Sequence, residues 1–289
     1  MTAVGRARAQ AFFELTKPGI TRMVVVTAAA GFYLGSHGPF DLTRFIHTLI
    51  GTALVAAGSS ALNQVREREI DARMNRTRGR PLPSGRVTPR AAALFSWTAA
   101  VLGVAYLAWR VNLLTAALAL LTLVSYVFLY TPLKQRTSLN TLVGAVPGAL
   151  PVVGGWTAAG GSLDPSAFAL FWILFLWQLP HFLALAWLYR EDYRRGGLAM
   201  LSLEDESGKS TARMAFLYAC TLLPVSLLPT LLQLTGSVYF FGALILGLGY
   251  AGVSLLLMRD ASHRVARGLF FTSIVYLPLL LALMVLDKG

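Results

Sequence analysis

The sequence predicts an all-α polytopic membrane protein with nine transmembrane helices packed in a bundle. Hydrophobic residues make up 56% of the 289 residues and charged residues only 13%, whereas a soluble domain has about 45–50% apolar and about 25% charged residues. The apolar residues form long blocks and do not alternate, so helices and not a β-barrel are expected to satisfy the backbone in lipid. The basic residues, in addition, gather on one side of the predicted membrane.

Nine apolar blocks approach or reach the roughly 20 residues that a helix needs to cross about 30 Å of hydrocarbon. In chain order they are 20–34, 45–62, 91–109, 113–130, 142–159, 168–189, 214–234, 238–258 and 269–286. The fifth block is rich in Gly and Pro (TLVGAVPGALPVVGGW), which lets helices approach closely or break around a cavity. We expect one integral membrane domain over residues 1–289.

The loops between the blocks alternate in charge. With a cytoplasmic amino terminus, only Arg44, Arg110 and Lys288 of the 25 Lys and Arg residues lie on the outer side. This distribution follows the positive-inside rule and places the carboxyl terminus outside. The net charge of +12 is therefore a topology signal, and we do not expect a nucleic-acid partner. Most acidic residues also lie on the inner side, so we expect the functional site at the cytoplasmic face.

The segment after the second block, NQVREREIDARMNRTRGRPLP at 63–83, combines acids with arginines. Asn63, Glu67 and Asp71 are spaced i, i+4, i+8, so on a continuing helix they share one face. Their oxygens are of the kind that Mg²⁺ prefers, with water and phosphate completing its shell. The arginines that follow, Arg76 and Arg80 among them, suit phosphate oxygens. These residues predict a site for magnesium and a polyphosphate; the alternative is a solvated loop whose charges serve only topology.

Two further inner loops carry similar residues. Lys134 and Arg136 lie in YTPLKQRTSLN at 130–140, and Asp192 lies in YREDY at 189–193. Taken alone, the second cluster is more simply a charged cap that ends a helix. His47 and His181 lie inside apolar blocks, where a hydrogen bond to a neighbouring helix is the commoner role and iron ligation is the alternative.

The pattern N-x-x-x-E-x-x-x-D at 63–71, followed by M-x-R-T-x-x-R-P-L-P-x-G at 74–85, resembles the first acidic motif of UbiA-type intramembrane prenyltransferases. Within that superfamily, YTPLKQRTSLNTLVGAVPGALP at 130–151, RPLPSGRVTP at 80–89 and WQLPHFLALAWLYREDYRRGGLAML at 177–201 are similar to the branch that farnesylates protoheme. The resemblance covers about residues 15 to 285, and three long blocks in order make it specific.

The resemblance implies a helix bundle around a cavity that opens at the cytoplasmic face of the cell membrane. It implies transfer of a farnesyl group from farnesyl diphosphate to heme B (protoheme IX) with addition of water, giving heme O, and Mg²⁺ as cofactor. The residues carried over fall into three groups: Asn63, Glu67, Asp71 and Asp192 for the metal, with Asn63, Asp71 and Lys134 catalytic; Arg76, Arg80, Lys134 and Arg136 for the diphosphate; and His181 or His47 for the heme. Besides these substrates, the implied partners are membrane lipid and a downstream heme A-forming enzyme or terminal oxidase assembly.

The sequence departs from the superfamily pattern in the second acidic motif. Leu188 stands where D-x-x-x-D would place its first acid, and an upstream acidic position corresponds to His181. In the first motif, Glu67 replaces the usual aspartate. Two rival functions remain: a UbiA-type prenyltransferase that acts on a quinone or chlorophyll precursor, which the missing second-motif aspartates disfavour, and a transporter, which the placement of charges at one interface disfavours.

Overall fold

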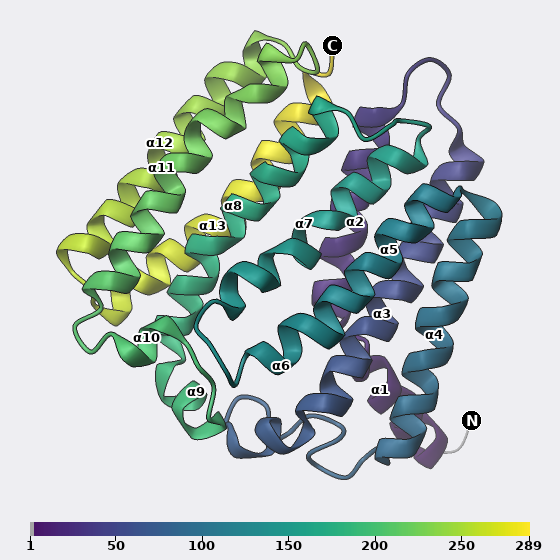
Figure 1. Ribbon diagram of the computed structural model, residues 1–289, viewed down its shortest axis with the longest axis vertical. Coiled ribbons are helices and arrows are strands. Elements are labelled where there is room, and N and C mark those ends of the chain that lie inside the picture. The colour runs from purple at the N-terminus through teal and green to yellow at the C-terminus, as the bar shows by residue number, and fades with distance from the viewer. Residues whose placement is uncertain (1–2) are drawn as a thin grey trace.

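The computed structural model, which describes residues 3–289, is built almost entirely from helices (Figure 1). The long ones are α2 (Pro18–Gly35), α3 (Leu42–Arg73), α4 (Pro89–Arg110), α5 (Leu113–Val124), α7 (Asn140–Ala158), α8 (Pro165–Leu188), α11 (Lys209–Leu231), α12 (Ser237–Arg259) and α13 (His263–Leu286). A π-helical segment (Ser125–Tyr130) and α6 (Thr131–Leu133) continue α5. The remaining helices are α1 (Ala3–Leu15), α9 (Arg190–Gly196) and α10 (Leu201–Glu204).

In the described chain, eight helical segments are long and apolar enough to cross a membrane, and they account for the last eight of the nine expected blocks. The first block coincides with α2, which packs along α7 in the same bundle. The protein is therefore a multi-pass membrane protein. The helix starts follow ordinary capping chemistry: Asp41, Thr88, Asn112, Asp164 and Ser262 each accept a hydrogen bond from the backbone three residues on.

The glycines of α7 allow the close helix contact that the sequence predicts. A Cβ atom on Gly155 would overlap the carbonyl oxygen of Ala28 in α2, and one on Gly31 would overlap that of Val152 in α7. Pro147 and Pro151 lie inside α7 without ending it. Small residues at these positions thus allow α2 and α7 to pack closely against each other.

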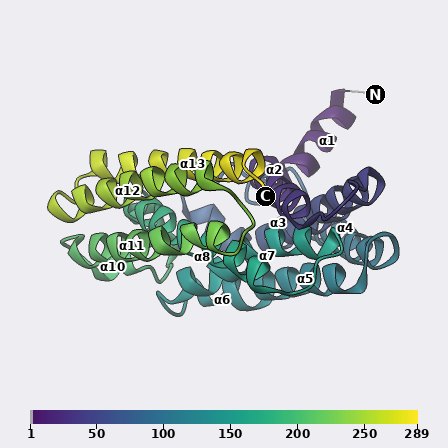
Figure 2. The ribbon, with the colours of Figure 1, turned by 90° about the horizontal axis from the view of Figure 1, so that it is seen from above.

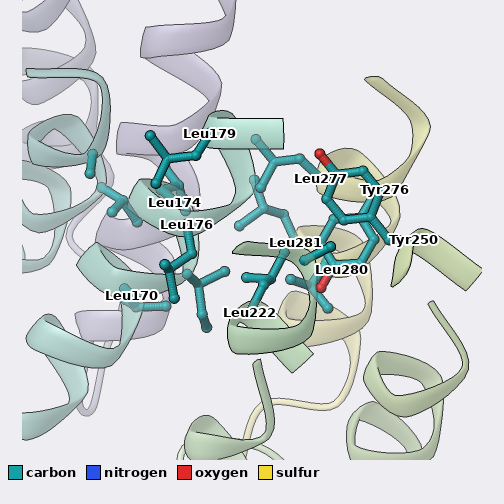
Figure 3. Packing of buried hydrophobic residues seen from close by; sticks show 14 of the residues in the cluster. Leu170, Leu174, Leu176, Leu179, Leu222, Tyr250, Tyr276, Leu277, Leu280 and Leu281 are labelled. Carbon is teal, nitrogen blue, oxygen red and sulfur yellow. The ribbon is translucent and has the colours of Figure 1, made fainter. Parts of the chain in front are cut away.

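The largest apolar core lies mainly among α8, α11, α12 and α13 and continues onto α2 and α7. Figure 3 shows Leu170, Leu174, Leu222, Leu277 and Leu281 facing one another there. Tyr250 and Tyr276 stack at 5.0 Å between ring centroids. Helix α8 packs against α11 and α13, and this packing fixes its position. One face of α8 lines part of the cavity described next.

The connections at the two ends of the bundle differ. In Figure 1 the segment between α3 and α4 lies with α9, α10 and the N-terminal helix at the lower end, and the carboxyl terminus lies at the upper end. Viewed from above, α1 projects away from the other helices (Figure 2). The loops that carry charge in the sequence are therefore gathered at one end of the molecule.

Candidate active site

A cavity of about 620 Å³ lies inside the bundle, and its walls come from α2, α3, α5, α7, α8 and α13. Most of its wall is apolar, but its end near the charged loops is lined by six charged side chains: Lys17, Glu67, Asp71, Arg76, Arg80 and Lys134. A concave apolar volume with a few convergent polar groups at one end suits an amphiphile with a charged head.

The stripe on α3 forms as the helical spacing predicts. Helix α3 runs without a break from Leu42 to Arg73, so it carries the stripe from membrane depth to the charged end. Asn63, Glu67 and Asp71 are all buried. Glu69, on the other face, has 74% of its side chain exposed and pairs with Arg68. The helix therefore separates acids that face the cavity from an acid that faces solvent.

Each carboxylate of the stripe is held by a cation from another segment. Lys134 Nζ lies 2.7 Å from Glu67 Oε1. Arg80 Nη1 lies 2.8 and 2.7 Å from the two oxygens of Asp71. Although burial lowers the pKa of Lys134, the adjacent carboxylate of Glu67 raises it well above its usual range. Both pairs are poorly exposed, so each charge depends on its partner.

The third stripe residue is held by a lysine that sequence reasoning missed. Lys17 Nζ donates to Asn63 Oδ1 at 2.6 Å, and Asn63 Nδ2 donates to Thr131 Oγ1 at 3.1 Å. Lys17 has φ of 47°, a left-handed conformation that is uncommon outside glycine. Gln64 fixes the same turn by donating to the carbonyl of Leu15 at 2.9 Å. Burial and the nearby charge of Arg80 lower the pKa of Lys17 to about 7. In the sequence, only the position of Lys17 directly before Pro18, where α2 begins, could have pointed to this residue.

The π-helical segment turns two tyrosines toward the polar end. Tyr126 and Tyr130 line the cavity and stack at 5.6 Å, and Lys134 Nζ lies 4.5 Å from the ring centroid of Tyr130. A Cβ on Gly144 would fall 2.5 Å from the Tyr130 ring, so only glycine leaves room for it. Single π-turns of this kind often occur at functional sites. Here the extra residue in the turn places aromatic faces beside the cations.

Arg76 reaches the cavity from the segment after α3. Its guanidinium lies over the rings of Tyr189 and Tyr193, 5.1 and 5.9 Å from their centroids. The backbone at Asn75 and Arg76 donates to the two oxygens of Asp192, each at 3.1 Å, and Arg195 donates to the same carboxylate. Burial raises the pKa of Asp192, but the hydrogen bonds from Arg195 and the two amides outweigh it, and the pKa is lowered.

Asp192 was expected to bind metal, but its contacts indicate a structural role. It does not line the cavity, and both of its oxygens accept hydrogen bonds from protein donors. The carboxylate instead ties the loop that carries Arg76 to α9. Sequence reasoning could not find this task because the partners are backbone amides more than a hundred residues away.

We expect Asp192→Asn to lower the free energy of unfolding by about 1–3 kcal/mol, since buried amides lose a charged acceptor. Because the pKa of Asp192 is lowered, its contribution is complete above the ordinary aspartate pKa of about 4 and is lost only as the pH falls through the lower, folded value. The deficit should therefore be constant from about pH 6 to about pH 8. Thermal unfolding in detergent measures it, with the exposed Glu191→Gln as control. If the variant keeps its stability but loses Mn²⁺ binding, Asp192 would instead be a metal ligand.

The remaining expected residues fall in different places. Arg136 is exposed on the loop after α6 and does not line the cavity. His181 is half-buried and lines the cavity wall. His47 lies at the opposite end of α3, where Nδ1 is 2.6 Å from the Tyr106 hydroxyl and Nε2 is 2.6 Å from Arg110 Nη2. With both ring nitrogens engaged away from the cavity, His47 is not placed to contact a molecule in it.

The donor set at the polar end fits a magnesium ion. Mg²⁺ takes one or two carboxylates and completes its shell with water and substrate phosphate, and the stripe supplies Glu67 and Asp71, which line the cavity. Asn63 does not line the cavity, and its amide oxygen accepts a hydrogen bond from Lys17. Among the described residues, no group of three or more His, Cys, Asp or Glu side chains is placed to hold a metal ion.

The sequence matches the UbiA prenyltransferase family over residues 24–275. Because this match spans most of the chain, the chain belongs to that family. A solved digeranylgeranylglyceryl phosphate synthase has the same fold, with a TM-score of 0.82 at 17% identity and with 97% of this chain and 98% of that one covered. A UbiA homolog from Archaeoglobus fulgidus, solved bound to GPP and Mg²⁺, has a TM-score of 0.66 at 15% identity, with 95% and 99% covered.

The curated relatives define the branch. The protoheme IX farnesyltransferase of Solibacter usitatus is 47% identical over 288 residues, with 96% of this chain and 98% of the relative covered. Protoheme IX farnesyltransferases are thus the branch of the family to which the chain is similar over nearly its whole length, which confirms the resemblance drawn from the motifs.

Proposed function

We propose that the protein transfers the farnesyl group of farnesyl diphosphate to a vinyl group of heme B, with addition of water, giving heme O and diphosphate. The observation that carries this proposal is the polar end of the cavity, where the buried carboxylates of Glu67 and Asp71 each pair with a cation beside an apolar volume. The name of the curated relatives supports the choice of farnesyl group and acceptor.

The metal is proposed to bind the α3 stripe. Asn63, Glu67 and Asp71 would hold Mg²⁺, and the solved archaeal homolog with GPP and Mg²⁺ supports metal use in the family. When bound, Mg²⁺ neutralises negative charge on the diphosphate. The longer arm of Glu67 carries the same charge as the usual aspartate, so the stripe keeps two carboxylates.

The cations are proposed to bind the diphosphate and to favour its departure. Lys134 and Arg80 already face the cavity, so they can exchange carboxylate oxygens for phosphate oxygens with little movement. Arg76 is oriented by Tyr189 and Tyr193 and adds a third donor. Arg136, exposed near the same loop, would attract the anion on its way in. These donors stabilise negative charge where it develops in the transition state, and in many enzymes this stabilisation contributes more to the rate than any other effect.

The bond changes follow from this arrangement. The C1–oxygen bond of farnesyl diphosphate breaks, and its electron pair leaves with the diphosphate. The π electrons of a heme vinyl group form the new bond to C1, and water oxygen bonds to the resulting cation and loses a proton. The ring faces of Tyr126 and Tyr130 lie beside the cations, where they can stabilise positive charge at C1.

The orientation and number of spans complete the proposal. We place α2 as a ninth crossing, which gives a single membrane domain over residues 1–289 with a cytoplasmic amino terminus and an outer carboxyl terminus. The distribution of basic residues supports this orientation in a cell membrane. The cavity then opens at the cytoplasmic face, and the apolar product is expected to pass through lipid to a heme A-forming enzyme or terminal oxidase assembly.

Labelled farnesyl diphosphate tests the acceptor. Membranes that contain the protein are incubated with the label, Mg²⁺ and heme B, and the lipid-soluble products are separated. We expect the label in heme. Label in a quinone or chlorophyll precursor would support the rival prenyltransferase, and uptake of label without a covalent product would support a transporter. Membranes without the protein provide the background.

A further inference from the structure

A second concave site lies on the outside of the bundle, where α1 meets the first turns of α4. This α1/α4 groove measures about 420 Å³, and it is lined by Phe12 of α1 and by Ala91, Leu94, Phe95, Thr98 and Ala99 of α4. The rings of Phe12 and Phe95 contact each other edge to face, with centroids 5.3 Å apart, and this contact joins the two helices. The groove shares no lining residue with the cavity that holds the stripe, and its only polar side chain is that of Thr98.

The depth of the groove indicates what can occupy it. Helix α4 is long and apolar enough to cross a membrane, and the groove follows it from Ala91 to Ala99, eight residues or about 12 Å along the axis. One leaflet of a hydrocarbon core of about 30 Å is about 15 Å thick. The groove therefore extends through most of the leaflet at the charged end of the bundle. A soluble ligand cannot reach its full length, whereas an acyl chain of that leaflet is already beside it.

An arginine lies one helical turn before a groove residue on each of the two helices. Arg8 precedes Phe12 by four residues on α1, and Arg90 precedes Leu94 by four residues on α4, so each arginine shares a helix face with the groove. Both arginines are exposed. Among the described residues, no acid pairs with either of them, because Glu14, the one acid of α1, lies 2.7 Å from a different arginine. Two guanidinium groups are therefore available at the polar end of an apolar groove.

We propose that the α1/α4 groove binds an anionic phospholipid of this leaflet, with an acyl chain along Phe12, Leu94 and Thr98 and the phosphate on Arg8 and Arg90. The planar fork of arginine suits phosphate oxygens. Its apolar stem lies along the groove while its charge stays at the level of the headgroups. The proposed orientation makes this the cytoplasmic leaflet, whose anionic lipids attract basic residues next to a spanning helix.

The lipid also acts on the active site, because α1 leads directly into the turn that carries Lys17. Ala11 and Leu15 are almost fully buried in a small core with residues of α3 and α4. Gln64 of α3 donates to the carbonyl of Leu15, and Lys17 donates to Asn63. The rest of α1 projects away from the bundle (Figure 2). A lipid that binds both α1 and α4 fixes this projecting helix, and with it the turn at Lys17.

Native mass spectrometry of the purified full-length protein in detergent tests the site. The protein is titrated with phosphatidylglycerol or with phosphatidylcholine of the same acyl chains. We expect the first phosphatidylglycerol to bind about 25-fold more tightly, about 5-fold for each of the two arginines. Arg8→Gln/Arg90→Gln should abolish this preference. Thr98→Trp, which fills the groove without changing a charge, should weaken the binding of both lipids.

Arg264→Gln/Arg267→Gln is the matched control. It removes the same charge from exposed arginines near the start of α13, on the same basic side of the membrane. We expect this control to keep the wild-type preference for phosphatidylglycerol. All the variants should keep the wild-type thermal midpoint in detergent alone, because every replaced side chain is exposed.

Equal loss of the preference in the α13 control would overturn the proposal, because general surface charge would then select the lipid. Unchanged lipid binding in Thr98→Trp, or equal affinity of the wild type for the two lipids, would also overturn it. Glycerol 3-phosphate, which has the charge but no acyl chain, should not compete, and full competition would mean that the arginines bind free phosphate. The titration contains no prenyl substrate, so its result is independent of the proposed function.

Discussion

Asp71→Asn is expected to lower the rate of heme O formation by about 10²–10³-fold, the usual cost of losing one charged contact to the transition state. The carboxylate is almost fully buried, and both of its oxygens face Arg80. Asparagine keeps the shape but removes the charge that the Arg80 guanidinium contacts and that we propose Mg²⁺ to share. The rate is measured at saturating Mg²⁺, together with Mn²⁺ binding in the presence of pyrophosphate.

Glu69→Gln is the matched control for Asp71→Asn. It removes the same charge from the same helix, two residues away, but the side chain is largely exposed. We expect nearly wild-type turnover and Mn²⁺ binding. Equal damage from the two substitutions, in protein with the same thermal stability, would mean that the stripe does not define the site. Asn63→Ala should resemble Asp71→Asn, because it removes the only neutral donor of the stripe.

Lys134→Met is expected to damage both stability and turnover. It leaves the buried carboxylate of Glu67 without its cation, and loss of one member of a buried ion pair costs about 3–5 kcal/mol. The double variant Glu67→Gln/Lys134→Met removes both charges, so we expect it to recover most of the thermal stability. Turnover should stay low in the double variant, because the diphosphate has lost a donor and the proposed metal site has lost a carboxylate.

The measurements are the thermal midpoint in detergent, taken from tryptophan fluorescence, and the rate of heme O formation. Both are made for the two single variants and the double variant, which completes a double-mutant cycle. A double variant as unstable as Lys134→Met would show that the pair is not coupled. A double variant with wild-type turnover would contradict both proposed roles, that of Lys134 as a diphosphate donor and that of Glu67 as a metal ligand.

The helices were predictable from the sequence because lipid imposes simple constraints. A spanning helix needs a long apolar block, and positive loops stay inside, so the long helices overlap the expected blocks. The bounds differ most at α3, which continues to Arg73, and at α13, which begins at His263. The i, i+4, i+8 spacing also predicted the buried stripe, since α3 continues past the membrane boundary. Helical geometry and solvation alone decide these features.

Features that depend on partners distant in sequence were not predictable. The sequence does not show where the helix of the sixth apolar block ends: Tyr189 separates α8 from α9. That break turns Asp192 toward the backbone of the loop after α3. The pairing of Lys17 with Asn63 likewise depends on how the start of α2 meets α3. Each is a tertiary contact with no local pattern to indicate it.

The most direct test of the central claim is conversion of heme by the purified protein in lipid vesicles. The vesicles receive heme B, farnesyl diphosphate and Mg²⁺, and the extracted hemes are separated by chromatography and identified by mass spectrometry. We expect heme B to be converted to a heme that carries one farnesyl group and one added water, with EDTA and Asp71→Asn each abolishing the product. No farnesylated heme, or full conversion in the presence of EDTA, would contradict the account.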